Sequence, residues 1–452
     1  MTYVETIKFL YNLERFGIKL GLENISIILN LFDNPHKKFK SIHIAGTNGK
    51  GSTAAMTASI LQYAGYKTGL YTSPHLQDFR ERIMVNGAMI PEEDVVELTE
   101  IIRCKMKGSP TLPLFKVAIN GGLTFFEFTT VMAFLYFSRE MVDFAVVEVG
   151  LGGRLDATNV LNPVLSIITE IDIEHTDYLG EDIKSIAREK GGIIKDNGAV
   201  ILSSTKTEVI ETIESICKGK NAKLYRIEKD FNGEAEYSNI HYQHFDFIDK
   251  HFESQIPKSR FLSLEIPLLG KYQIMNASTS VKAALVLNEA GFKIGEKAIH
   301  EGLKNVRWNG RLEIVSENPL FILDGAHNPA AAKALSEELE GMSNSKFGIQ
   351  IHKIILIIGI LKDKDFKGII SLLAQIADYI IIVKPKTLRS RNPDDLKDEF
   401  FKYTEGVEII EDIPDAISKA KNIATVNDLI CITGSFFTVG EAIKFIKFGV
   451  ES

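Results

Sequence analysis

Short apolar runs alternate with glycine-rich turns and with segments of helical spacing along most of the chain. Residues 52–63 and 272–290 have helical periodicity, and Gly65 and Gly291 follow them as C-terminal caps. The apolar runs that have the length of buried strands are residues 42–45, 70–72, 144–149, 164–169 and 199–203. This alternation is typical of βαβ units, so it predicts a mostly parallel sheet with helices on both faces.

The pattern changes in the second half of the chain. Between Leu224 and Leu268 apolar and polar residues alternate, which predicts a small antiparallel sheet appended to the parallel one. Near Leu312 a second α/β series begins, with the strand-like runs LFILD, KIILIIGIL, YIIIVK and LICITGS. We therefore expect an N-terminal domain over residues 1–305 and a Rossmann-like C-terminal domain over residues 306–452. The segment VRWNGR at the boundary would be the hinge.

The composition excludes several classes of protein. The chain has 452 residues, of which 45% are hydrophobic and 25% charged, as in ordinary globular proteins with a large core. Its formal net charge of −7 gives no reason to expect binding to nucleic acid. A phosphate group held by this protein must therefore lie in a local pocket.

Cysteine usage and apolar content point to the cytoplasm. Cys104, Cys217 and Cys431 lie far apart and share no metal-ligand spacing, which fits a reducing compartment. The longest apolar run, Ile354 to Leu361, is far shorter than the ~20 residues that span a bilayer. We expect a cytoplasmic protein that does not bind membranes and that is a monomer.

The strongest chemical signal is GTNGKGS, between a predicted strand and a predicted helix. A glycine-rich turn in this setting points successive N–H groups at an anion, which the helix dipole also favours. The phosphate loop predicted here consists of Gly46, Thr47, Asn48, Gly49, Lys50, Gly51 and Ser52. Lys50 would contact the β- and γ-phosphates. Gly51 separates this lysine from Ser52, so the usual pattern G-x-x-x-x-G-K-[ST] is not met strictly.

Glu148 ends an otherwise apolar strand, AVVEV. An ionised carboxylate is costly to bury unless it is paired or binds a metal ion. A magnesium ion on the nucleotide phosphates would satisfy it, because Mg²⁺ prefers oxygen ligands. The alternative is a structural ion pair with Arg154.

Two further residues of the N-terminal half are ambiguous. His175 follows an apolar strand, where open α/β sheets place ligands, although a lone histidine there is more often structural. Lys190 lies in a helix that leads into an apolar strand, and most lysines are solvated.

In the C-terminal half, ILDGAHNPAAAKAL carries Asp324 and His327 in a loop between a strand and a helix. Asn328 is a good N-cap and Pro329 a good first helical residue, so part of the motif is structural. The position of Asp324 and His327 favours ligand binding. Ser435, in TGSFFTVGEA, could contact a small polar substrate or form a local turn.

Nine motifs in one order along nearly the whole chain resemble the folylpolyglutamate synthases and the bifunctional dihydrofolate synthases of the Mur ligase superfamily. The motifs are GTNGKGS, YTSPHL, FFEFTT, EVGLGGRLDATN, EHTDYLG, REKGGI, RWNGRLE, LDGAHNP and TGSFFTVGEA. The resemblance implies a P-loop ATPase-like N-terminal domain and a glutamate ligase domain at the C-terminus. Asn309 stands where the family more usually has proline, which bears on hinge stiffness.

The resemblance also implies an activity. Such enzymes use ATP to convert a pteroate or folate carboxylate into an acyl phosphate, which the amino group of L-glutamate then attacks. The substrates would be folate or dihydropteroate together with L-glutamate, and ATP with two magnesium ions would be required.

Site residues carry over by position in the matching motifs. The implied magnesium ligands are Ser73, Glu148, His175 and Lys190, the last as a carbamylated lysine. The implied ATP contacts, besides the phosphate loop, are Asn276, Arg311, Asp324 and His327. The implied substrate contacts are Thr124, Phe125, Phe126, Glu127, Arg154, Asp156 and Ser435. Lys50, His175, Lys190 and Arg311 would act in catalysis, Arg311 from the hinge as the domains close on ATP.

Two other functions stay open at this point. One is a ligase of the same superfamily that joins amino acids to a UDP-muramoyl peptide, although FFEFTT and LDGAHNP favour folate. The other is a P-loop kinase or nucleotide-gated binding protein, which would leave Asp324, His327 and Arg311 without a role.

Overall fold

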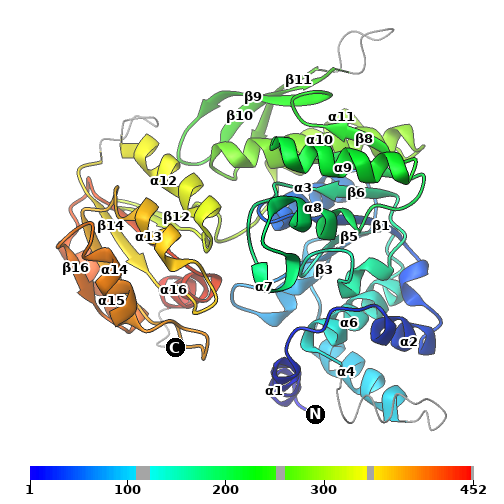
Figure 1. Cartoon of the computed structure of the whole chain (residues 1–452), viewed down its shortest axis with the longest axis horizontal. Helices are drawn as coiled ribbons and strands as arrows, with labels where there is room; N and C mark the ends of the chain where they lie inside the picture. Colours follow the sequence, from blue (N-terminus) through cyan, green and yellow to red (C-terminus); the bar gives the residue numbers. More distant parts are fainter. Residues whose placement is uncertain (108–122, 251–259, 344–350, 449–452) are drawn as a thin grey trace. The chain divides into compact units, whose positions relative to one another are not determined.

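The computed structural model describes residues 1–107, 123–250, 260–343 and 351–448. Two compact units are present (Figure 1). The first comprises residues 1–234, 247–264 and 275–306, and the second comprises residues 235–246, 265–274 and 307–452. The domain division predicted at residue 305 stays a prediction, because a compact unit need not be a domain that folds by itself.

The first unit is built on an eight-stranded sheet with the order β4-β3-β2-β5-β1-β6-β7-β8. Its strands are β1 (Lys40–Ala45), β2 (Thr68–Tyr71), β3 (Ile83–Val85), β4 (Ala88–Met89), β5 (Phe144–Glu148), β6 (Leu165–Ile168), β7 (Ala199–Leu202) and β8 (Lys223–Arg226). All neighbours are parallel except β3, which is antiparallel to both β2 and β4. The central strands are buried on both faces, as their continuous apolar runs predicted.

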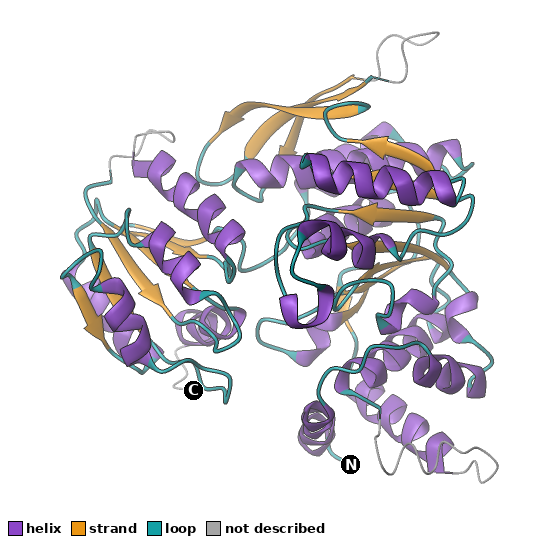
Figure 2. Cartoon of the chain, viewed as in Figure 1, coloured by secondary structure: helices purple, strands orange, loops and turns teal. Residues whose placement is uncertain are grey.

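Helices flank the strands of this sheet (Figure 2). They are α1 (Tyr3–Asn12), α2 (Glu23–Leu31), α3 (Lys50–Tyr63), α4 (Glu92–Lys107), α6 (Phe125–Arg139), α7 (Thr176–Leu179), α8 (Ile183–Gly191), α9 (Thr207–Gly219), α10 (Lys271–Glu289) and α11 (Glu296–Lys304). Helix α3 begins at Lys50, two residues before the predicted start. It tolerates burial on nearly all sides because Ala54, Ala55 and Ala58 are small.

A three-stranded antiparallel sheet follows, with the order β11-β10-β9. Its strands are β9 (Phe231–Ser238), β10 (Gln243–Asp249) and β11 (Arg260–Ile266). The prediction of an antiparallel sheet is confirmed, but its start at Leu224 is wrong. Residues 223–226 form β8, which pairs in parallel with β7. Tyr225 is 2% exposed and lies against α10, where its hydroxyl donates to Glu289.

The second unit holds a six-stranded sheet with the order β12-β13-β17-β14-β15-β16. The strands are β12 (Glu313–Glu317), β13 (Leu320–Leu323), β14 (Ile354–Ile358), β15 (Tyr379–Ile382), β16 (Val407–Ile409) and β17 (Leu429–Thr433). Its helices are α12 (Pro329–Ser343), α13 (Phe366–Leu373), α14 (Pro393–Phe400), α15 (Ile413–Ile423) and α16 (Phe436–Phe448). Every pairing is parallel except that of β12 with β13. The α/β prediction for both halves of the chain is confirmed.

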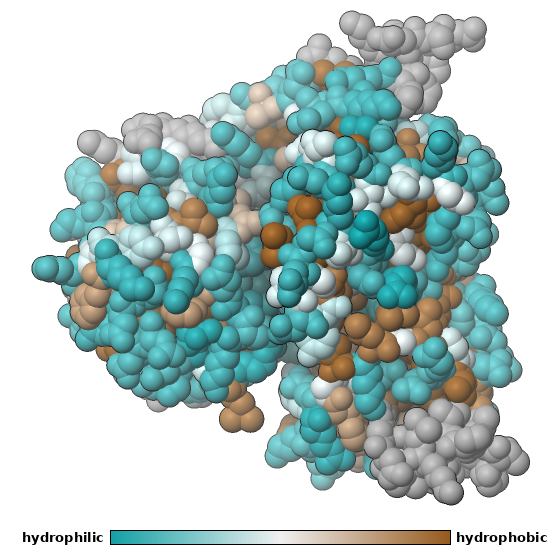
Figure 3. Space-filling model, in the orientation of Figure 1, coloured by the Kyte–Doolittle hydropathy of each residue, from teal (hydrophilic) through white to brown (hydrophobic). Residues whose placement is uncertain are grey.

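The surface seen in Figure 3 is covered mainly by hydrophilic side chains, with hydrophobic ones in smaller groups between them. Among the described residues, no helix combines the length and the apolar character needed to cross a membrane.

A buried ion pair ties α10 to the antiparallel sheet. Lys282 Nζ lies 2.6 Å from Asp249 Oδ2, and neither side chain is exposed. The same ammonium group lies 4.6 Å from the centre of the Tyr225 ring. Removing one partner of such a pair leaves a buried charge without its counterion.

We expect Asp249→Asn to lower the free energy of unfolding by about 3–5 kcal/mol, since the Lys282 charge would lose its ionic partner. Urea unfolding followed by circular dichroism measures this change. Glu211→Gln is the matched control, because it breaks the solvent-exposed pair of Glu211 with Lys184. It should change stability by no more than about 0.5 kcal/mol. Equal effects of the two substitutions would contradict the prediction.

Candidate active site

Several predicted site residues meet at the carboxyl ends of neighbouring strands in the first unit. Strand β1 lies between β5 and β6, and all three are parallel. The loop 46–49 follows β1, Glu148 ends β5, and the segment 169–175 follows β6. Ligands of open α/β sheets bind at this edge.

The predicted phosphate loop depends on two glycines in unusual backbone conformations. Gly46 has φ +152°, and a Cβ there would lie 1.9 Å from Thr169 Oγ1. Gly49 has φ +86° and precedes α3, and a Cβ there would lie 2.5 Å from Asn276 Oδ1. Any other residue would push the loop away from these neighbours. Asn276, far away in sequence, is therefore a direct neighbour of the loop, and its contact with ATP stays a prediction.

Lys50 folds back over the loop in which it lies. Its ammonium group donates hydrogen bonds to the carbonyl oxygens of Gly46, at 3.0 Å, and Thr47, at 2.9 Å. A lysine ammonium has three N–H donors, so one is left to face an anion. The positive charge is thus held at the N-terminus of α3, whose dipole favours an anion there as well.

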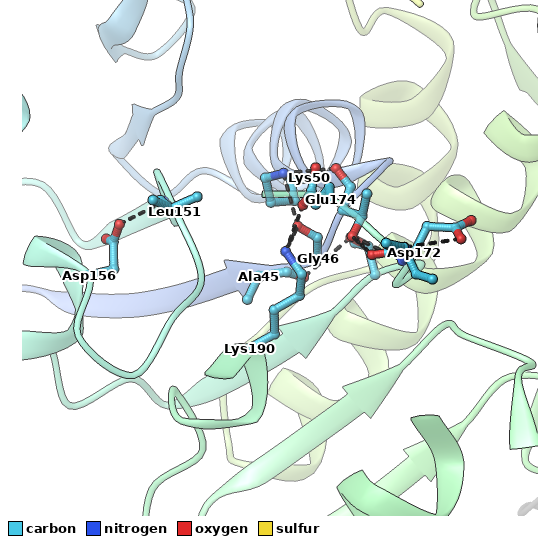
Figure 4. A network of polar contacts seen from close by, with 11 residues as sticks. Ala45, Gly46, Lys50, Leu151, Asp156, Asp172, Glu174 and Lys190 are labelled. Carbon is cyan, nitrogen blue, oxygen red and sulfur yellow. Dashed lines mark hydrogen bonds and ion pairs between the residues drawn. The ribbon is translucent and has the colours of Figure 1, made fainter. Parts of the chain in front are cut away.

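Lys190 reaches the same carbonyl oxygen from α8 (Figure 4). Its Nζ donates to Gly46 O at 2.8 Å and to Glu174 Oε1 at 2.9 Å, and its side chain is 2% exposed. Burial lowers the pKa of Lys190 to about 8. Although burial acts to raise the pKa of Glu174, Lys190 and Lys50 outweigh it and hold that pKa at about 2. The pair is therefore ionised at neutral pH.

Glu174 was missed by sequence reasoning, which singled out only its neighbour His175. The signal was a carboxylate next to His175 in the segment EIDIEHTD, which follows a buried strand. His175 is half-buried and has a left-handed backbone, φ +49°, immediately before α7.

Glu148 and Ser73 are direct neighbours. The backbone N–H of Ser73 donates to Glu148 Oε2 at 3.0 Å, and Glu148 is buried. The sequence alternative, in which Arg154 pairs with Glu148, is not what the contacts of Arg154 show. Arg154 instead pairs with Glu189 at 2.9 Å, because the turn after β5 carries it to α8.

Within the parts of the chain that the structure describes, no group of three or more His, Cys, Asp or Glu side chains could hold a metal ion. The predicted ligand set includes Ser73 and a modified Lys190, so it is not a cluster of that kind.

Thr124 and Glu127, predicted to contact substrate, form the capping box of α6. The hydroxyl of Thr124 accepts the N–H of Glu127 at 3.1 Å, and Glu127 Oε2 accepts the N–H of Thr124 at 2.8 Å. Both residues are buried. Their contacts fix where the helix begins and how it carries Phe125 and Phe126.

These two aromatic residues face different neighbours. Phe125 stacks on Tyr11 with ring centres 5.8 Å apart, and the guanidinium of Arg82 lies 5.0 Å from its centre. A Cβ on Gly150 would lie 2.4 Å from Phe126 Cζ. The turn after β5 therefore packs directly on the Phe126 ring. Phe125 thus contacts the N-terminal helix α1, and Phe126 contacts the turn after β5.

Asp156 lies apart from the Gly46 group, in the turn after β5 (Figure 4). Its carboxylate accepts the N–H groups of Leu151 and Thr158, each at 2.9 Å. Burial raises its pKa despite these bonds. Asp156 therefore shapes the loop that follows β5, and its contact with substrate stays a prediction.

In the second unit, Asp324 and Arg311 are close to one another. The carboxylate of Asp324 is buried, and its pKa is raised by that burial although the guanidinium of Arg311 opposes the shift. Arg311 lies with its guanidinium carbon 4.4 Å from the centre of the Phe436 ring. Phe436 was not predicted, and only its position next to Ser435 could have indicated it.

His327 and Ser435 flank this group. His327 Nδ1 lies 2.8 Å from Gly325 O, and its ring centre is 5.2 Å from that of Phe436. The hydroxyl of Ser435 accepts the N–H of Thr438 at 3.1 Å, at the start of α16. The local turn considered for Ser435 is therefore present, and binding of a substrate there stays a prediction.

Two protein families match this chain. The Mur ligase middle domain matches residues 44–284, and the glutamate ligase domain of the Mur ligases matches residues 310–436. The chain is 33% identical to the dihydrofolate synthase/folylpolyglutamate synthase of Bacillus subtilis, over 98% of this chain and 99% of that protein. It spans about half the length of a probable bifunctional folylpolyglutamate synthase/dihydropteroate synthase of Halobacterium salinarum, to which it is 34% identical over 98% of its own length.

Solved structures with the same fold match nearly the whole length of this chain. The folylpolyglutamate synthase of Thermotoga maritima has a TM-score of 0.82 and 37% identity, covering 100% of this chain and 98% of that one. The FolC protein of Escherichia coli, in complex with DHPP and ADP, has a TM-score of 0.84 and 30% identity, covering 98% and 97%. A bifunctional enzyme with Mn, AMPPNP and L-glutamate bound has a TM-score of 0.82 and 28% identity, covering 98% of both. The chain belongs to the Mur ligase family, in its branch of folylpolyglutamate and dihydrofolate synthases.

Proposed function

We propose that this protein uses ATP to join L-glutamate to the carboxylate of a folate, and that it also accepts dihydropteroate. The observation that supports this most strongly is that Lys50 and Lys190 both donate to the Gly46 carbonyl oxygen, with Glu174 paired to Lys190. They lie on the strand edge where Glu148 ends β5. Two ammonium groups at a glycine loop suit a polyphosphate. The ligands of the related enzymes, ADP, AMPPNP, DHPP and L-glutamate, fit the same activity.

The reaction would proceed in two displacements. A carboxylate oxygen of the folate attacks the γ-phosphorus of ATP, which gives an acyl phosphate and ADP. The amino group of glutamate then attacks the acyl carbon, an amide forms, and phosphate leaves. The first step depends on positioning and on positive charge around the phosphoryl group. Lys50 and the N–H groups at the start of α3 provide both, and Arg311 is the further cation that the family resemblance assigns to ATP.

A divalent cation fits the donors at this edge. Glu148 is a buried carboxylate at a strand end, Ser73 lies beside it, and His175 follows β6. Carboxylate and hydroxyl oxygens are ligands that Mg²⁺ accepts. When bound, the ion would offset the negative charge of the phosphates. We assign Ser73, Glu148 and His175 to hold it, and the backbone N–H of Ser73 orients the carboxylate of Glu148.

Lys190 would take part as a carbamate. Addition of CO₂ to its neutral amine forms a C–N bond, releases a proton and replaces the ammonium with a carboxylate. With a pKa of about 8, roughly a tenth of the side chain is neutral at pH 7. The new carboxylate would be the oxygen donor for a second magnesium ion.

We also propose that the protein acts as a monomer in the cytoplasm, with small molecules as its partners.

Phosphate release from ATP distinguishes the candidate functions. We expect release with folate or dihydropteroate plus L-glutamate, and none with UDP-muramoyl peptide plus amino acids or with ATP alone. Product formation is checked by mass spectrometry of the glutamylated folate. Release with ATP alone would favour a nucleotide-gated protein, and release with the muramoyl peptide would favour the other branch of the family.

We expect Lys50→Ala to lower kcat at least about a hundredfold, because the cation facing the phosphates is lost while the fold is kept. Steady-state phosphate release measures this, and circular dichroism checks the fold. Lys184→Ala is the control, since Lys184 is exposed on α8 and pairs only loosely, at 3.6 Å, with Glu211. Normal turnover by Lys50→Ala would refute the assignment of the loop.

Lys190→Arg keeps a positive charge but cannot form the carbamate, so we expect it to lose most activity. Incubation with ¹³C-bicarbonate should give a carbamate resonance in the natural protein that grows from about pH 6.5 to pH 8, as the neutral amine increases. The resonance should be absent in Lys190→Arg. The resonance should persist in Lys195→Arg, because we assign the carbamate to Lys190. Lys195 is the matched control, since burial lowers its pKa too. Full activity of Lys190→Arg would show that only the charge of Lys190 matters.

A further inference from the structure

Arg80 and Arg82 both lie in the 3₁₀ helix η3 (Phe79–Arg82), but their surroundings differ. Arg80 is partly exposed, and its Nη2 pairs with Asp78 Oδ2 at 2.7 Å. Arg82 is 8% exposed, and it forms no ion pair with any residue that the structure describes. Burial lowers the pKa of Arg82, since it disfavours the charged form. A buried cation of this kind is stabilised when an anion binds to it.

The guanidinium of Arg82 is held in one direction by its neighbours. Its Nε donates a hydrogen bond to His75 Nδ1 at 2.7 Å, and its central carbon lies 5.0 Å from the centre of the Phe125 ring. Because arginine has no acceptor, His75 Nδ1 carries no proton, and the N–H at His75 Nε2 lies 3.1 Å from the Tyr11 hydroxyl. The main-chain carbonyl oxygen of Arg82 accepts the N–H of Thr72 at 3.1 Å.

The end of the guanidinium has donors to spare. The bond to His75 uses the N–H at Nε, and the remaining four N–H donors belong to Nη1 and Nη2. Within the described parts of the chain, neither Nη group makes a hydrogen bond. Two parallel N–H groups match the two oxygens of a carboxylate, which arginine binds in this way and lysine does not. The free end of Arg82 therefore suits a carboxylate.

Strand order places this cation next to the proposed metal ligands. The first sheet runs in the order β3-β2-β5-β1, with the phosphate loop after β1 and Glu148 at the end of β5. Ser73 comes shortly after β2, and Arg82 directly precedes β3. Tyr71 pairs with Ile83 in an antiparallel register, so the end of β2 and the start of β3 lie at the same edge of the sheet. Arg82 and the phosphate loop thus lie on opposite sides of Glu148.

The neighbours of Arg82 favour an acid with an aromatic part. Phe125 stacks on Tyr11, and the buried ring of Phe79 meets Phe125 edge to face, with ring centres 6.2 Å apart. Glutamate has no apolar ring to place among these side chains. The nucleotide phosphates already have Lys50 and the N-terminus of α3. The carboxylate of dihydropteroate is attached to a benzene ring, and that of folate belongs to a glutamyl group linked to such a ring.

We propose that Arg82 binds the carboxylate of the folate or dihydropteroate through its two Nη groups and holds it across Glu148 from the phosphate loop. A metal ion at Glu148 and Ser73 would then lie between the acid and the nucleotide. The inference rests on the proposed function and adds to it the residue that recognises the acid.

The test compares dihydropteroate with its carboxamide, because dihydropteroate has a single carboxylate and the amide lacks its charge. We expect the natural protein to bind the acid at least about tenfold more tightly than the amide, as for a hydrogen bond between charged groups. In Arg82→Met the two ligands should bind about equally, and the Kd of the amide should change by no more than about twofold. Calorimetric titration in the presence of Mg²⁺ and ADP measures the four Kd values.

Arg80→Met is the matched control, because Arg80 lies in the same short helix but is already paired with Asp78. It should keep the preference for the acid, and the Kd for ADP should be unchanged in both variants. Circular dichroism checks the fold. If Arg82→Met weakens binding of the acid and the amide equally, its role is structural and the inference is overturned.

Arg82→Lys tests the geometry of the contact and serves if Arg82→Met does not fold. It keeps the charge but lacks the planar pair of donors, so its preference for the acid should be smaller than that of the natural protein. An undiminished preference would overturn the two-donor contact. If the proposed function fails, the natural protein binds neither form of dihydropteroate and releases no phosphate. If the natural protein prefers the acid and Arg82→Met does so equally, only this inference fails.

Discussion

The site depends on the carbonyl oxygen of Gly46, which accepts hydrogen bonds from two ammonium groups. Lys50 and Lys190 both reach it, and Glu174 pairs with Lys190. Two cations in a partly buried place repel each other, and this repulsion contributes to the lowered pKa of Lys190. An anion with several charges relieves that repulsion. The loop therefore gains more from a polyphosphate than from a single small anion.

Strand order explains why these groups meet. With β1 between β5 and β6, three loops leave the sheet at adjacent points, and each brings one kind of chemistry: Lys50, Glu148 and Glu174. Ala45 pairs with Ile168 at the ends of β1 and β6, so the next residues, Gly46 and Thr169, lie in close contact. Only glycine fits at position 46, because a Cβ there would collide with Thr169. Packing of the sheet thus sets the geometry of the loop directly.

Local features of this architecture could be predicted from sequence. GTNGKGS was identified because glycine, lysine and a following helix are adjacent in the chain, and β1 and β14 because continuous apolar runs indicate buried strands. Contacts between distant segments could not be predicted in this way. The bond between Lys190 and Gly46 spans 144 residues, and the contact of Arg311 with Phe436 also joins distant segments. Likewise β8 was assigned to the wrong sheet, since a four-residue run does not specify its partner strand.

Three buried carboxylates that the family resemblance assigns to ligands, Glu127, Asp156 and Asp324, all accept backbone N–H groups. A carboxylate has about four lone-pair positions, so two or three backbone and side-chain donors leave little room for a ligand. Loss of activity after replacing one of them would follow from a displaced loop as readily as from a lost contact. Lys50 and Arg311 differ from them, because their charged ends are held by a carbonyl or a ring and keep donors for an anion. Glu127, Asp156 and Asp324 therefore fix the loops around them, whereas Lys50 and Arg311 are the cations that we propose for the nucleotide.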